Sequence, residues 1–474
     1  VMGYGYYTAT TSLKRELWGK SLGWIGFWLA LAGVLTAAVP LLTGNASVLY
    51  TFYPPLRANP AFYIGAAMLV VGSWFWCLVM VMTMTQWKKE NPGETVPLAM
   101  YGTVANAIMW FITSLGVTLE VLFQLIPWSL GISDTVDVGL ARTLFSWTLH
   151  AIVYFWLFPA YIAFYTLMPK QAGGRLISDH MARLAFIMLF VFSVPIGFHH
   201  LYMDPFQAAG WKFLHMTGTF MVAVPTLITG FTVIASMELA GRLRGGKGLF
   251  GWLKTLPWGN PMVLATGLAM LLLTVGGFGG VVNASYSMNA MVHNTQWVTG
   301  HFHLIFGGTT VMMYFAIAYY LWPKMTGKEL FSVSMARKQL WLWFFGMIVL
   351  TLPWHQIGIT GQPRRISSTP YDAELTRMWG TSEFLMIVGG VILLISAVLL
   401  IFNLFRTHGN AIPEAVLEVE YAQPVHSTAR MPHLMNSFTF WFWLVVVYMI
   451  ASYGYPILQF FLFDQSFGTV PWSI

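Results

Sequence analysis

Two histidines separated by one residue interrupt an otherwise apolar stretch of the chain. His301 and His303 follow a third histidine, His293, and the apolar run continues to Trp322. Ionisable side chains at membrane depth are costly and are usually functional. Each residue of an α-helix turns by about 100°, so the imidazoles of His301 and His303 point to opposite sides of one helix. We expect two separate metal centres with the helix between them, and haem fits that description. The alternative is histidines satisfied by neighbouring carbonyls.

Three more histidines could hold another metal. Tyr154 follows His150 by one helical turn and so shares its face. His199 and His200 are adjacent, and Pro195 just before them disturbs the helix, so both rings can converge with His150 on one centre. Three nitrogen ligands with an open position suit copper or zinc, and the sequence leaves both metals open. The alternative for the tyrosine is a hydroxyl bonded to the backbone.

Hydroxyl side chains form two stripes that could hold water and pass protons. The alternative for threonine hydroxyls is a bond to the carbonyl of the preceding turn. The first stripe consists of Tyr161 and Tyr165, and Ser178 lies in the loop beyond it. The second stripe consists of Thr226, Thr229 and Thr232. Glu120, inside an apolar span, is either a proton-handling group or a protonated, hydrogen-bonded acid.

Composition defines the chain as an all-α polytopic membrane protein. Of its 474 residues 57% are hydrophobic and only 9% are charged. A span takes about 20 apolar residues. About eleven transmembrane helices are expected, near 21–43, 61–86, 98–127, 141–168, 182–202, 213–238, 260–283, 300–323, 338–357, 381–404 and 436–463. No repeat or linker divides residues 1–474, so a single transmembrane helical domain is the simplest architecture.

The net charge of +7 reflects topology and gives no indication of nucleic-acid binding. Loops on the N-terminal side of the bundle hold 18 of the 24 basic residues, so the positive-inside rule places that side in the cytoplasm. The opposite side carries the adjacent Arg364 and Arg365, which would suit the propionate carboxylates of a haem, since Arg pairs with carboxylate bidentately. The lone cysteine, Cys77, cannot form a two-thiolate metal site.

Taken together, these motifs resemble the catalytic subunit I of haem-copper oxygen reductases. The strings 48–56, 169–174, 238–246 and 292–295 resemble the type B branch, the ba3-type cytochrome c oxidases. The resemblance implies that His150, His199 and His200 bind the copper ion CuB. It implies that Tyr154 is catalytic and cross-linked to His150.

The same resemblance implies further roles. His301 would ligate a high-spin haem, expected to be a-type, and His303 a low-spin haem of b or a type. Arg364, Arg365 and His293 would bind propionates, and the two hydroxyl stripes with Ser178 would form the proton path. Asn289 stands where type B enzymes have an aspartate near the propionates.

Partners and location follow from the family as well. The resemblance implies a terminal oxidase in the inner membrane of a prokaryote that reduces O2 to water and takes up or translocates protons. Electrons would come from cytochrome c through a CuA-bearing subunit II, and a small single-helix subunit is a further partner. Two alternatives remain. One is nitric oxide reduction in the same superfamily, which the tyrosine disfavours, and the other is a secondary transporter, for which no internal repeat is found.

The family also predicts something that this sequence does not contain. Its low-spin haem needs a second histidine from an early helix, yet no histidine precedes His150. The first expected span aligns with the family's third. We predict that two further helices exist, as a preceding segment or a separate polypeptide. Haem spectra of the intact protein should then show a six-coordinate low-spin haem, and a five-coordinate second haem would contradict this.

Overall fold

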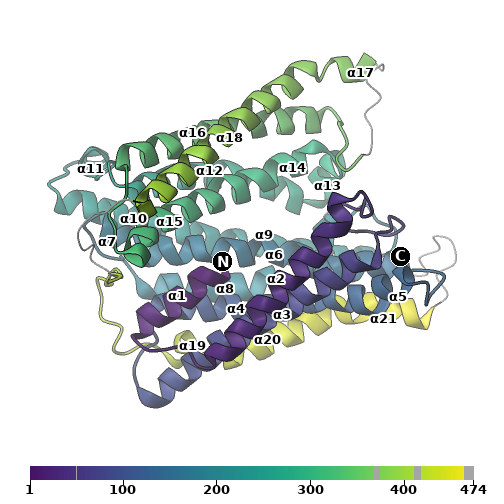
Figure 1. Cartoon of the computed structure of the whole chain (residues 1–474), viewed down its shortest axis with the longest axis horizontal. Helices are drawn as coiled ribbons and strands as arrows, with labels where there is room; N and C mark the ends of the chain where they lie inside the picture. The colour runs from purple at the N-terminus through teal and green to yellow at the C-terminus, as the bar shows by residue number, and fades with distance from the viewer. Residues whose placement is uncertain (50, 367–373, 410–417, 464–474) are drawn as a thin grey trace. The chain divides into compact units, whose positions relative to one another are not determined.

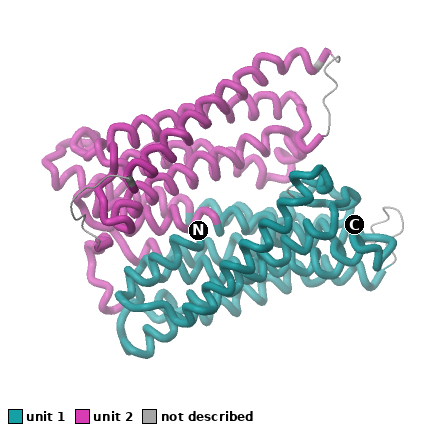
Figure 2. The backbone as a smooth tube through the Cα atoms, in the orientation of Figure 1, with its two compact units in different colours: residues 1–155, 183–225, 431–474 teal, residues 156–182, 226–430 magenta. Residues whose placement is uncertain are grey.

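The computed structural model describes residues 1–49, 51–366, 374–409 and 418–463, and its regular structure is helical (Figure 1). No β-strand occurs among these residues, which contain only the isolated bridges Leu176–Pro424 and Thr295–Pro363. The predicted all-α class is confirmed. The chain divides into two compact units (Figure 2), Val1–Phe155 with Arg183–Pro225 and Met431–Ile474, and Trp156–Ala182 with Thr226–Arg430. The single domain over 1–474 stays a prediction.

The first unit contains the N-terminal helices, the His199–His200 segment and the C-terminal helices. Its elements are α1 (Met2–Leu13), α2 (Lys20–Leu42), α3 (Pro60–Glu90), α4 (Leu98–Glu120), the π-helical η1 (Val121–Leu125), α5 (Ile126–Ser129), the first part of α6 (Val138–Thr166), most of α8 (Asp179–Ser193), the 3-10 turn η2 (Phe198–His200), α9 (Ala209–Met221), the start of α10 (Ala223–Leu243), α19 (His433–Asn436), α20 (Thr439–Met449), the π-helical η4 (Ile450–Gly454) and α21 (Tyr455–Leu462).

The second unit contains the segment with His301 and His303 and the helices that pack around it. Its elements are the remainder of α6, α7 (Met168–Gln171), the start of α8, the remainder of α10, α11 (Gly251–Thr255), α12 (Pro261–Ala284), α13 (Tyr286–Val292), α14 (Gln296–His303), the π-helical η3 (Leu304–Thr310), α15 (Val311–Thr326), α16 (Val333–Ile359), α17 (Glu374–Arg377) and α18 (Gly380–Gly409).

Ten helical segments of the described chain are long and apolar enough to cross a bilayer, and they match ten of the eleven predicted spans. The remaining prediction, 182–202, corresponds to α8, which is shorter than expected and ends at Ser193 after 15 residues. Pro195 explains this end, because proline lacks the amide hydrogen that would continue the helical ladder. The backbone up to His200 is consequently irregular, apart from the short turn η2.

A π-helical segment interrupts the helix predicted over 300–323. α14 ends at His303, and the wider turn of η3 precedes α15. A π turn leaves carbonyl groups without their ordinary helical partner. Here the indole of Trp343 on α16 donates to the carbonyl of Gly307 at 2.7 Å. The interruption therefore lies directly after the two histidines and is held by a side chain of a neighbouring helix.

Glycines allow α2 and α3 to run side by side in close contact (Figure 1). A Cβ added to Gly33 would lie 2.6 Å from the carbonyl oxygen of Gly65, and one added to Gly26 would lie 2.7 Å from that of Gly72. The contacts repeat every seven residues on each helix, which is two turns. Small residues at such positions are the usual means of close helix packing in membranes.

Replacing Gly65 by valine should therefore destabilise the protein. The new side chain would collide with the backbone of α2, since a Cβ at this position would lie 2.5 Å from the Gly33 carbonyl oxygen. Overpacking of this kind costs about 1–3 kcal/mol. Thermal unfolding of Gly65→Val measures the loss, with Gly390→Val on α18 as the control, because a Cβ there meets nothing within 4 Å. Equal unfolding temperatures for the two variants would contradict the packing.

Candidate functional site

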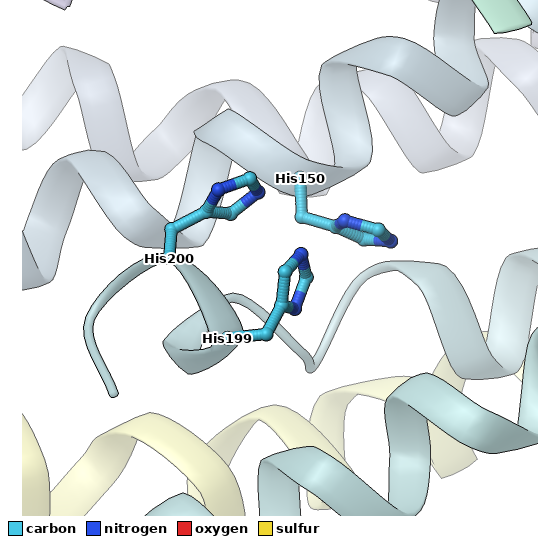
Figure 3. A group of neighbouring side chains, drawn as sticks. All are labelled: His150, His199 and His200. Carbon is cyan, nitrogen blue, oxygen red and sulfur yellow. The ribbon is translucent and has the colours of Figure 1, made fainter. Parts of the chain in front are cut away.

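Three imidazoles from two segments converge in the first unit (Figure 3). His150 comes from α6, and His199 and His200 come from η2. One ring nitrogen of each lies within 4.8 Å of those of the other two. The ring centroids of His150 and His199 are 4.4 Å apart, and those of His199 and His200 are 4.1 Å apart. The short turn η2 thus directs the adjacent side chains of His199 and His200 toward His150. A regular helix would turn them about 100° apart.

The chemistry of this cluster is that of a metal site. His150 and His199 are buried, with exposed fractions of 8% and 6%. Among the described residues no aspartate, glutamate or cysteine belongs to the group. Three neutral imidazoles suit a copper or zinc ion. Tyr154 lies beside the cluster, with its ring centroid 4.7 Å from that of His150.

His215, which the sequence analysis did not select, holds the backbone that carries two of these ligands. Its Nδ1 accepts hydrogen bonds from the amides of Gly197 and Phe198 at 3.0 and 3.3 Å. Its Nε2 lies 3.1 Å from the carbonyl oxygen of Ser452, in the π-helical η4. With Nδ1 accepting, Nε2 must be the donor in a neutral ring. The ring also stacks on Phe198, with centroids 3.8 Å apart.

One turn further along α9, a threonine contacts the ring of one of the three histidines. Thr219 lies four residues after His215, and its hydroxyl is 3.2 Å from Nδ1 of His199. A hydrogen bond to one ring nitrogen orients the other toward the metal, which is how second-shell groups usually act. α9 therefore supports the cluster at two levels, the backbone before the histidines and the ring of one of them.

An ion pair fixes the chain just after the cluster. Asp204 lies 2.9 Å from the guanidinium of Arg142 on α6, and Lys212 on α9 donates to its backbone carbonyl at 2.8 Å. Burial raises the pKa of the Asp204 carboxyl to about 6, against the opposing charges of Arg142 and Lys212. Because the carboxyl has a pKa of about 3.9 in the unfolded chain, the raised pKa favours the protonated form in the folded protein. Stability is therefore greatest below about pH 4 and falls as the pH rises through about 6, where the buried carboxyl ionises.

In the second unit, His301 lies against a wall of glycines on α12. Its Nδ1 is 2.8 Å from the carbonyl oxygen of Gly276. A Cβ at Gly279 or Gly280 would lie 3.1 Å from atoms of the ring, so larger residues would crowd it. With Nδ1 donating to the carbonyl, Nε2 is the nitrogen with a lone pair for a metal. These glycines belong to the string 276–280, which was not selected from the sequence.

His303 is oriented in the same way but within its own helix. Its Nδ1 is 2.8 Å from the carbonyl oxygen of Thr299, one turn earlier. The ring of Trp354 on α16 lies beside it, with centroids 4.7 Å apart. His355, also unselected by the sequence analysis, packs against Gly300, where a Cβ would lie 2.6 Å from its Nδ1. Nδ1 of both His301 and His303 is therefore bonded to a backbone carbonyl, as the alternative interpretation expected. Nε2 of each ring is the nitrogen left for a metal.

The predicted propionate residues meet at the start of α14. The amide of Gln296 donates to the carbonyl of Gln362 at 2.9 Å, and that of Arg364 donates to the carbonyl of Asn294 at 2.8 Å. This pairing brings the loop with Arg364 and Arg365 to the segment after His293. The ring of His293 lies 2.8 Å from Oδ1 of Asn289, whose amide donates to the carbonyl of Asn283.

The two hydroxyl stripes face each other between α6 and α10. Tyr161 donates to Thr226 at 3.5 Å, and the hydroxyls of Tyr165 and Thr229 are 2.5 Å apart. Thr232 instead donates to the carbonyl of Ile228, as the alternative interpretation expected.

Ser236, which the sequence analysis did not select, extends the stripe. It lies one turn beyond Thr232 and accepts from the amide of Ile177. The neighbouring Ser178 accepts from the amide of Met181 at 3.2 Å. The described contacts therefore join the tyrosine and threonine stripes and connect the end of the threonine stripe to the loop that holds Ser178.

Glu120 ends α4 inside the first unit and is fully buried. Neither carboxyl oxygen has a hydrogen-bond partner among the described residues. The described residues thus give no support to the alternative of a hydrogen-bonded acid at this position.

The chain matches known proteins over nearly its whole length. The family described as "Cytochrome C and Quinol oxidase polypeptide I" matches residues 1–392. Cytochrome c oxidase subunit 1 of Thermus thermophilus is 42% identical over 453 residues, which cover 93% of this chain and 79% of that one. The corresponding subunit of a Synechocystis species is 25% identical over 80% of this chain and 67% of its own length.

A solved structure agrees with these relatives. A cryo-EM structure of a heme-copper terminal oxidase dimer superimposes with a TM-score of 0.91 at 37% identity, covering 96% of this chain and 81% of that chain. The chain therefore belongs to the family of subunit I of the haem-copper terminal oxidases. It is an oxidoreductase subunit of a bacterial oxidase and a multi-pass membrane protein, and its family implies haem groups, a copper ion and partner subunits such as subunit II.

The role of His215 can be tested by comparing two substitutions. His215→Phe keeps a ring against Phe198 but leaves the amides of Gly197 and Phe198 without an acceptor, which costs about 1–3 kcal/mol for each unpaired buried group. His215→Asn retains a carbonyl oxygen near the position of Nδ1. We expect the phenylalanine variant to unfold at lower temperature and to retain less copper per haem than the asparagine variant. Copper content equal to wild type in both variants would show that His215 does not position the ligands.

Proposed function

We propose that this chain reduces O2 to water at a haem–copper centre and takes the protons from the cytoplasm. Electrons would come from cytochrome c through a CuA-bearing subunit II. The observation that carries the proposal is the convergence of His150, His199 and His200 within 4.8 Å. When bound, the haem and copper groups would supply the electrons and the site at which O2 is reduced.

The copper role of the triad is supported by the chemistry of its donors. Three imidazoles and no carboxylate gather there in the described part of the chain. Nitric oxide reductases of the superfamily usually add a carboxylate, so oxygen is favoured over nitric oxide. Tyr154 would donate a proton and an electron, and its place one turn after His150, with the rings 4.7 Å apart, supports the proposed cross-link.

The haem roles rest on the orientation of two rings. Nδ1 of His301 and of His303 each lies 2.8 Å from a backbone carbonyl oxygen, which directs Nε2 of each ring away from its anchor. His301 would hold the high-spin haem, proposed to be a-type, and His303 the low-spin haem of b or a type. Arg364, Arg365 and His293 would bind propionates. Asn289 cannot ionise, so a proton-loading carboxylate at that position is absent from this proposal.

A proton path along α6 and α10 completes the proposed function. Protons would enter near Ser178, pass Ser236 and Thr232, and reach Thr229 and Tyr165. From there Thr226 and Tyr161 lead up α6, the helix that also carries Tyr154. The contacts of Tyr165 with Thr229 and of Tyr161 with Thr226 support the middle of this path. Type B enzymes have a single proton path, and four segments of this sequence resemble the type B branch. The resemblance therefore favours one path of this kind here.

Metal analysis tests the central function. Apart from the copper of subunit II, the purified oxidase should contain one copper ion for every two haems, and a CO-difference spectrum should report one CO-binding haem. His199→Ala should lose the copper and retain both haems. His408→Ala, at the exposed end of α18, should leave all three groups in place and serves as the control. Iron in place of the copper would reverse the choice in favour of nitric oxide reduction.

The proton path predicts a selective kinetic defect. Tyr165→Phe removes the hydroxyl that contacts Thr229 and should slow O2 reduction by at least about tenfold, since proton transfer by a positioned group contributes 10²–10⁴. Tyr319→Phe removes another buried hydroxyl, bonded to Gln339 at 3.1 Å, and should have little effect. Oxygen uptake with unchanged haem and copper content measures the difference. Equal rates for the two variants would place the path elsewhere.

A further inference from the structure

A cavity of about 520 Å³ lies in the first unit, where α3 ends and α20 begins. Its wall is mostly apolar and includes Met84 on α3, Ile108 on α4 and Phe442 and Trp443 on α20. The uncharged polar residues of the lining are Thr85, Ser437 and Thr439. Its rim carries the two lysines that end α3, Lys88 and Lys89. Neither the metal cluster nor the proposed proton path uses any of these residues.

The rim is positive, and one of its two amines is held in place. Nζ of Lys88 donates to the carbonyl of Asn436 at 3.1 Å, which fixes it beside the cavity. Lys89 is exposed and has no ion-pair partner among the described residues. No acidic residue lines the cavity. The acid that follows the lysines, Glu90, is already paired with Arg15 at 2.7 Å.

The depth of the cavity matches the boundary between lipid headgroups and acyl chains. Lys88 and Lys89 occupy the last turn of a 31-residue membrane span, on the side that the basic residues identify as cytoplasmic. The indole of Trp443 is 61% exposed, as expected of an aromatic residue in the interfacial belt. One end of the cavity is therefore cationic at headgroup level, and the remainder is mostly apolar.

We propose that this cavity binds one anionic phospholipid of the cytoplasmic leaflet. The phosphate would lie between the amines of Lys88 and Lys89, and an acyl chain would lie along Met84, Ile108 and Phe442. A zwitterionic lipid would bring an ammonium group toward two lysines and is disfavoured. Free phosphate would gain nothing from the apolar wall. Basic pockets between membrane helices on this side commonly bind such headgroups.

Trp443 provides a local probe for the test. The purified oxidase complex is placed in phosphatidylcholine bilayers that contain a fixed fraction of bromine-labelled phosphatidylglycerol or bromine-labelled phosphatidylcholine, since bromine quenches indole fluorescence on contact. The signal of Trp443 is the difference between wild type and Trp443→Phe. We expect stronger quenching of this signal by phosphatidylglycerol than by phosphatidylcholine at the same fraction.

Lysine substitutions decide whether the anion is recognised. Each basic residue near an anionic lipid is worth about a fivefold change in affinity, so Lys89→Ser should weaken phosphatidylglycerol binding about fivefold and the double serine variant about thirtyfold. Lys89 has an exposed side chain, so the single variant should fold normally. Lys254→Ser, an exposed lysine on the same predicted side, is the matched control and should change nothing.

Three results would overturn the proposal. Equal quenching by the two lipids would leave only an apolar groove without anion recognition. Unchanged binding in Lys89→Ser and in the double variant would remove the lysines from the site. Competition by inorganic phosphate as effective as that by unlabelled phosphatidylglycerol would indicate a free-phosphate site instead of a lipid site.

Discussion

The imidazoles proposed as haem ligands each need one nitrogen bonded to the protein and the other left for a metal. His301 and His303 achieve this with backbone carbonyls of Gly276 and Thr299, both at 2.8 Å from Nδ1. An unsatisfied polar group in an apolar interior is costly. The carbonyl anchors therefore fix the ring orientation and the tautomer together. One carbonyl comes from α12 and the other from α14 itself.

Irregular backbone supplies much of that arrangement. The chain between Ser193 and Phe198 leaves the helical path at Pro195, which lets two adjacent histidines converge with one from α6. The π-helical η4 offers the carbonyl of Ser452 to His215. The π-helical η3, just after His303, offers that of Gly307 to Trp343. These deviations from regular helix lie beside the proposed ligands. In a regular α-helix the same backbone carbonyls would accept hydrogen bonds from amides of their own helix.

The elements that could be predicted from sequence are those with local signals. Apolar length predicted eleven spans, of which ten match the structure, and the spacing of His301 and His303 predicted that they lie on different faces. The features that could not be predicted depend on contacts between distant segments. His215 is one histidine in an apolar helix, and only the fold shows that it meets Gly197 and Ser452. Ser236 and the glycines at 279 and 280 acquire their roles in the same way, from residues far along the chain.

The claim on which these roles depend is that one helix separates two haem centres. The most direct measurement is the optical spectrum of His301→Ala and His303→Ala, recorded reduced minus oxidised and again with CO. Loss of the CO-binding haem alone in His301→Ala, and of the low-spin haem alone in His303→Ala, is the expected result. Loss of the same haem in both variants, or of neither, would contradict it.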